Sequence, residues 1–84
     1  MAKFIDVWTC YLKDCDKDIV VRGKILLNVE NIKWIQMERF SSGYVIKVVT
    51  GEDYYAYAWE IAEESEAYNK MFKLQDKLNE IKEL

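Results

Sequence analysis

The sequence contains no histidine and no proline, and only three glycines and two cysteines among its 84 residues. Without histidine, the commonest general base and the commonest metal ligand of proteins are both missing. Without proline, the turns must be made by glycine, asparagine, aspartate and serine. Cys10 and Cys15 lack the Cys-x-x-Cys spacing. We therefore expect two reduced thiols with no redox or metal-binding role.

The motifs of common catalytic sites are also missing. The chain has no Gly-x-Ser-x-Gly elbow, no phosphate-binding glycine loop and no Cys–His pair. Asp14, Asp16 and Asp18 alternate as in a calcium loop, but the glycine and glutamate that complete such a loop are missing at the required spacing. We expect a solvated hairpin loop there. We predict that the protein is not an enzyme, with no catalytic residue, cofactor or metal ion.

No apolar run is long enough to span a membrane. Asp6 interrupts the apolar segment that an N-terminal signal peptide would need, so we predict a cytoplasmic protein. The net charge of −3 disfavours sequence-independent binding to nucleic acid, which requires a basic face. An apolar fraction of 51% and a charged fraction of 32% are typical of a soluble globular chain, here a single domain.

The hydrophobic pattern changes its period along the chain. Apolar residues alternate or form short blocks from Phe4 to about Tyr57, and repeat at helical spacing from about Trp59 to Leu84. This pattern predicts an α+β domain, with an antiparallel β-meander of four to five strands in residues 1–58 and one long C-terminal helix in 59–84. The expected strands are 3–12, 19–28, 32–40, 44–50 and 54–58. Gly23 is expected to bend the second strand or to mark a β-bulge.

Residues 51–58 allow two interpretations. Thr50 and Asp53 have the spacing of a helix capping box, which would start the helix near Gly51. Alternatively, the segment is a fifth strand, because Tyr55, Tyr57 and Trp59 alternate with small residues. We prefer the strand.

The predicted helix carries an apolar stripe that Tyr68 and Phe72 widen in its first half. The stripe consists of Ala67, Met71, Leu74, Leu78 and Ile81. In one interpretation the whole stripe covers the sheet. In the other, which we favour, a helix of about 40 Å is longer than a small sheet, so its last turns extend beyond it. The exposed seam would then mediate self-association through Met71, Leu74, Leu78 and Ile81.

Aromatic residues are numerous, with three tryptophans and six tyrosines. They cannot all be interior in so small a domain, and exposed tyrosine and tryptophan are typical of protein interfaces. We predict a binding surface formed by Trp34, Tyr55, Tyr57 and Trp59.

The segment from Lys24 to Ile35, Lys-Ile-Leu-Leu-Asn-Val-Glu-Asn-Ile-Lys-Trp-Ile, resembles the flagellar FlbD-like family of small proteins from bacteria and phages. In that family a strand ends in asparagine, and a short turn leads through isoleucine into the next strand, a hairpin and a helix. The chain differs in its long acidic loop at residues 13–18 and in its longer helix. The resemblance implies an intracellular, non-enzymatic accessory protein with a β-meander and a terminal helix, and it transfers no functional residue.

Together these features predict a small, non-enzymatic protein–protein interaction module that forms a homo-oligomer through its C-terminal helix. Such a module suits a phage or mobile-element accessory protein or an inhibitor of a host protein. The alternative is a protein that binds a small ligand or single-stranded nucleic acid by stacking bases on the aromatic residues of the sheet.

Overall fold

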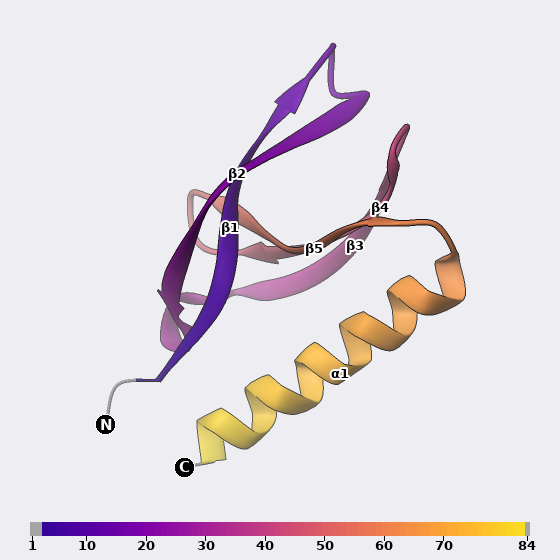
Figure 1. The fold of residues 1–84 in the computed structure, drawn as a ribbon. Helices are drawn as coiled ribbons and strands as arrows, with labels where there is room; N and C mark the ends of the chain where they lie inside the picture. Colours follow the sequence, from indigo (N-terminus) through magenta and orange to yellow (C-terminus); the bar gives the residue numbers. More distant parts are fainter. Residues whose placement is uncertain (1–2, 84) are drawn as a thin grey trace.

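The structure is a computed structural model that describes residues 3–83. It confirms the predicted α+β class, with an antiparallel sheet and one C-terminal helix (Figure 1). The elements in chain order are β1 (Phe4–Lys13), β2 (Asp18–Asn28), the 3₁₀ turn η1 (Val29–Asn31), β3 (Trp34–Phe40), β4 (Gly43–Val49), β5 (Tyr54–Ile61) and α1 (Glu64–Glu83).

The sheet has the strand order β2-β1-β5-β4-β3, so β2 and β3 are its two edges. Because only the short η1 segment separates these two strands in sequence, the sheet must curl to bring its edges toward one another. The far ends are also joined, since the backbone N–H of Ser41 donates to the carbonyl of Lys17 over 3.0 Å. The tips of the β1–β2 and β3–β4 hairpins are therefore held together.

Residues 54–58 form a strand, as preferred, and the capping-box interpretation is wrong. Thr50 and Asp53 instead close the β4–β5 turn, in which the N–H of Thr50 donates to the carbonyl of Asp53 over 2.8 Å. The predicted start of the helix near Trp59 is also wrong. Because Ile61 still pairs with Tyr44 of β4, β5 continues past Trp59 and α1 begins only at Glu64.

The prediction that the last helical turns extend beyond the sheet is wrong. Leu74 and Leu78 are only 1% and 2% exposed, so both are fully buried within a single chain. Helix α1 lies along the curled sheet (Figure 1), and Ile32 and Ile35 pack against the core that includes its second half. The late start of the helix and the support from the η1–β3 region together place the whole stripe against the protein's own sheet.

Helix α1 and one face of the sheet enclose the larger hydrophobic core, called here the helix-side core. Its buried residues are Ile5, Val7, Leu27, Val29, Ile46, Val48, Ile61, Ala67, Leu74 and Leu78. Neighbouring strand residues point to opposite faces, so Val45, next to Ile46, belongs to a second cluster on the other face. This outer cluster comprises Phe40, Val45 and Ala56 with Trp8, Cys10, Leu12, Ile19, Val21 and Trp59 around them.

A β-bulge in β2 lets the first hairpin contribute to both clusters. Trp8 pairs with Lys24 while Cys10 pairs with Val21, so Arg22 and Gly23 together face a single residue of β1. The expected irregularity at Gly23 is thus confirmed. Since one extra residue reverses the facing of all that follow, Ile19 and Val21 face the outer cluster and Ile25 and Leu27 the helix-side core.

Among residues 3–83, no helix is both long and apolar enough to cross a membrane.

Candidate functional site

The structure does not bring the four predicted surface aromatics together. Trp34 is 55% exposed on edge strand β3, where its indole N–H donates to the side chain of Gln36 over 2.8 Å. Tyr55 and Tyr57 pack against the helix-side core, whereas Trp59 packs in the outer cluster. The predicted surface is therefore divided between two faces of the sheet.

A bulge in β5 explains this division. Ile46 pairs with Ala58 and Lys47 pairs with Ala56, so Tyr57 is an extra residue with no partner opposite it. Strict alternation would place Tyr55, Tyr57 and Trp59 on one face, but the extra residue turns Trp59 to the other. The sequence holds no glycine near Tyr57 to signal the bulge.

On the outer face, Trp59 contacts Trp8, which was not part of the predicted binding surface. The ring centroids of Trp8 and Trp59 are 5.1 Å apart with an interplanar angle of 72°, an edge-to-face contact. The two side chains become neighbours because β1 joins β5 through the pairing of Trp8 with Ala56. No local pattern predicts that pairing, since the two strands are distant in sequence.

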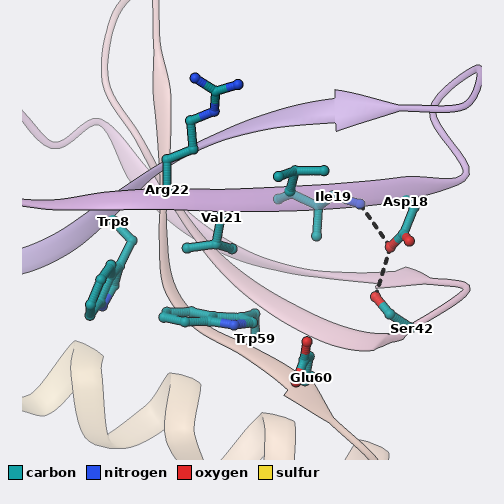
Figure 2. A pocket seen from close by; sticks show the side chains of 9 residues that line it. Trp8, Asp18, Ile19, Val21, Arg22, Ser42, Trp59 and Glu60 are labelled. Carbon is teal, nitrogen blue, oxygen red and sulfur yellow. Dashed lines mark hydrogen bonds between the residues drawn. The ribbon is translucent and has the colours of Figure 1, made fainter.

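A cavity of about 300 Å³ lies beside this tryptophan pair (Figure 2). It is called here the edge groove, and it is lined by Trp8, Asp18, Ile19, Val20, Val21, Arg22, Ser42, Trp59 and Glu60. Alternate side chains of a strand point to opposite faces, so a cavity lined by five consecutive β2 residues must border the backbone edge itself. In Figure 2 the Arg22 side chain points away from both tryptophans, in keeping with this geometry.

One end of the edge groove is fixed by hydrogen bonds between the two hairpin tips. The carboxylate of Asp18 accepts from the hydroxyl of Ser42 over 2.8 Å and from the N–H of Ile19 over 2.9 Å (Figure 2). Both bonds lower the pKa of Asp18, and the bond from Ser42 has the larger effect. The Ser41 hydroxyl also donates to the carbonyl of Lys17 over 2.9 Å. These bonds hold the β3–β4 tip beside the start of β2.

The opposite wall contains an unusual backbone conformation. Glu60 has φ +56°, in the left-handed region that non-glycine residues rarely adopt. Gly43 lies close by with φ +129°, and a Cβ there would come within 2.9 Å of the carbonyl oxygen of Ile61. Backbone strain of this kind occurs often at functional sites. Here it places Glu60 on the groove wall.

A second cavity, of about 380 Å³, shares Trp8 with the edge groove. It is called here the basic cavity, and it is lined by Asp6, Trp8, Lys24, Tyr57, Ala58, Lys70 and Lys73. Lys24 forms an ion pair with Asp6 over 3.3 Å, and its ammonium group lies 5.9 Å from the centroid of the Trp8 ring. The walls therefore come from β1, β2, β5 and α1.

The one buried charged side chain in the described part of the chain is Lys47, which is 6% exposed. Its ammonium group lies 3.0 Å from the carboxylate of Glu38, 4.3 Å from the centroid of the Tyr54 ring and 5.3 Å from that of Phe40. The Gln36 amide donates to the same carboxylate over 2.7 Å. Because these contacts satisfy the lysine, we assign it a structural role.

The two cysteines differ in their surroundings, so we expect them to differ in reactivity. Cys15 is exposed, whereas Cys10 is half-buried in the outer cluster. Burial raises the pKa of the Cys10 thiol, and the nearby Lys47 charge and a hydrogen bond with the backbone of Ala56 offset part of the rise. Since the thiolate is the nucleophile, iodoacetamide at pH 8 should alkylate Cys15 about tenfold faster or more.

Peptide mass spectrometry at timed intervals measures both alkylation rates in one sample. The same reaction in strong denaturant is the control, and there the two rates should converge. Equal rates in the folded protein would contradict the burial of Cys10.

Within residues 3–83, no three Cys, Asp or Glu side chains gather closely enough to hold a metal ion. Comparison of the chain with protein-family models, with curated proteins and with solved structures found no match. The resemblance to the FlbD-like family stays a prediction.

Proposed function

We propose that this protein is a non-enzymatic protein-binding module whose partner adds an extended segment to the outer edge of β2. In this mode of recognition, backbone hydrogen bonds provide affinity and pockets beside the strand provide specificity. The observation that carries the proposal is the edge groove, a cavity that follows an edge strand and has two tryptophans in its wall.

The described strands leave one side of β2 without a neighbour, because β1 alone pairs with it. An edge strand presents unpaired N–H and C=O groups to an incoming strand. Trp8 and Trp59 supply an apolar wall next to this edge, and tryptophan is enriched among the residues that dominate binding energy at interfaces. A side chain of the partner would contact this wall while its backbone pairs with β2.

For self-association, we propose a different surface of the helix from the apolar stripe. Leu74 and Leu78 belong to the helix-side core, while Tyr68 and Phe72 are 40% and 58% exposed on α1 and stack with ring centroids 6.1 Å apart. Any helix-mediated homo-oligomer would therefore use these two aromatic residues. A role as a phage or mobile-element accessory protein, or as an inhibitor of a host protein, stays a prediction, as does the alternative of base stacking.

The test blocks the edge groove with a bulky side chain. Random peptides displayed on phage are selected on the wild-type protein, and the Kd of each enriched peptide is measured by fluorescence anisotropy. Ser42→Trp places an indole at the groove wall, so we expect it to raise the Kd at least tenfold. Hydrogen exchange should show protection of the backbone amides of residues 19–22 when a peptide is bound.

Ser65→Trp is the matched control, because it makes the same substitution at an exposed position of α1, outside the groove lining. It should leave the Kd within about twofold, and circular dichroism should show that both variants remain folded. The proposal would be overturned if no peptide is enriched, or if the enriched peptides bind Ser42→Trp as tightly as the wild type.

A further inference from the structure

The basic cavity concentrates positive charge on a chain whose overall charge is negative. Its wall holds three lysines and one carboxylate, a local excess of two positive charges, against −3 for the whole sequence. The lysines come from two elements that are distant in sequence, Lys24 from β2 and Lys70 and Lys73 from α1. Folding therefore creates a cationic site that is not visible as a basic run in the sequence.

Only one of these lysines has a carboxylate partner in the cavity wall. Lys24 pairs with Asp6 over 3.3 Å, and both side chains are about half exposed. Lys70 and Lys73 are exposed on α1, one helical turn apart, and both border the cavity. Residues three apart on a helix lie on the same face, so these two ammonium groups can approach one ligand together.

The basic cavity adjoins the edge groove. Trp8 lines both cavities, and β2 borders the edge groove through Arg22 and the basic cavity through Lys24. A segment paired with the outer edge of β2 would thus pass from the Trp8–Trp59 wall toward three lysines. Charge complementarity at an interface requires carboxylates at this end of the segment.

We infer that the partner segment is acidic at one end, and that its carboxylates bind in the basic cavity to Lys24, Lys70 and Lys73. This inference rests on the proposed function, because it specifies the chemistry of the segment that docks along β2. Asp6, the one carboxylate in the cavity wall, pairs with Lys24. The carboxylates of the partner segment would therefore contact chiefly Lys70 and Lys73. Tyr57 and Trp8 form the apolar sides of the same cavity.

An acidic peptide fits the cavity better than a nucleic acid. A single-stranded nucleic acid needs a basic track that follows several phosphates, together with aromatic rings on which bases stack. Here the three lysines surround a single cavity, and the edge-to-face contact with Trp59 already covers part of the Trp8 ring. The experiment must therefore distinguish binding of an acidic peptide from binding of nucleic acid phosphates.

The test uses two probes that need no apolar anchor, so it does not depend on docking along β2. Hexaglutamate peptide and the oligonucleotide dT8 are each titrated into ¹⁵N-labelled full-length protein, and chemical shifts are followed. We expect hexaglutamate to shift the amide signals of Lys24, Lys70 and Lys73 and the Trp8 indole. The shifts should vanish in 0.5 M NaCl, since an exposed ionic contact is strongly screened at that salt concentration, where the Debye length is about 4 Å.

The double variant Lys70→Glu/Lys73→Glu should weaken hexaglutamate binding at least fivefold. Lys77→Glu/Lys82→Glu is the matched control, because it makes the same charge change on the same helix outside the basic cavity. The control should weaken binding less than twofold. Both variants replace exposed side chains, so both should remain folded.

Three results would overturn the inference. They are no chemical shift change with hexaglutamate, equal weakening of hexaglutamate binding by both double variants, and tighter binding of dT8 than of hexaglutamate. Failure of this experiment alone would leave docking along β2 intact, since the peptide selection tests that separately. Failure of the selection alone would leave an anion site without a strand-docking function.

Discussion

Replacing Leu78 by alanine should lower the free energy of unfolding by about 3 kcal/mol, within the usual range for removing a buried leucine. Leu78 is 2% exposed and lies in the helix-side core. A domain this small has a stability of only about 5–10 kcal/mol, so the loss is a large fraction of the total. Leu78→Lys would place a charge in the same core and should prevent folding. Urea denaturation followed by circular dichroism measures both effects.

Phe72→Ala is the matched control on the same helix, because Phe72 is 58% exposed, stacks on Tyr68 and is not part of the helix-side core. It should change the free energy of unfolding by less than about 1 kcal/mol. Light scattering after size exclusion should be recorded for all variants. If Leu78→Ala dissociated an oligomer while leaving the stability of the monomer unchanged, Leu78 would belong to a self-association seam and its burial against the sheet would be contradicted.

The second large effect is expected at the ion pair of Lys47 and Glu38. Glu38→Gln keeps the shape of the side chain but removes the negative charge 3.0 Å from the buried ammonium group. An uncompensated buried charge destabilises a protein by about 3–5 kcal/mol. Because Glu38 is partly exposed, we expect Glu38→Gln to lower the free energy of unfolding by about 2 kcal/mol. Thermal or urea unfolding at neutral pH measures this loss.

Lys47→Met provides the comparison, since it removes the desolvated charge and leaves Glu38 accessible to water. We expect it to change the free energy of unfolding by less than about 1 kcal/mol, because an apolar side chain of similar length can replace a buried ion with little loss. The double variant should resemble Lys47→Met, since the loss in Glu38→Gln arises from the lysine that remains. If Lys47→Met lowered the free energy of unfolding more than Glu38→Gln does, the ammonium group would stabilise the fold through more than its ion pair with Glu38.

The hydrophobic period was sufficient to predict the elements. Alternation between Phe4 and Tyr57 and helical spacing after it led to four or five strands, the order of elements and the α+β class, with residues 51–58 open between strand and helix. Period is a local property, because the backbone geometry of strand or helix decides which residues share a face. The bulge at Gly23 was also foreseeable, since a glycine inside an apolar strand indicates one.

The boundary of α1 and the role of its stripe were not foreseeable in the same way. The helical period is satisfied equally by a stripe that packs on its own sheet and by one that packs on a second copy. The continued pairing of β5 with β4 through Ile61 delays the helix to Glu64, and the η1–β3 region supports its second half. Both facts depend on strand partners that are distant in sequence.

The candidate site depended still more on tertiary structure. An extra residue at Tyr57 turned Trp59 away from Tyr55, and the pairing of β1 with β5 brought Trp8 beside it. The absence of histidine, of glycine motifs and of paired cysteines favoured binding over catalysis as the predicted function, and abundant aromatics indicated an interface. Which aromatics meet, and which strand edge they border, follows from register and sheet curvature. Those properties are decided by contacts between distant segments, which residue type and spacing along the chain do not encode locally.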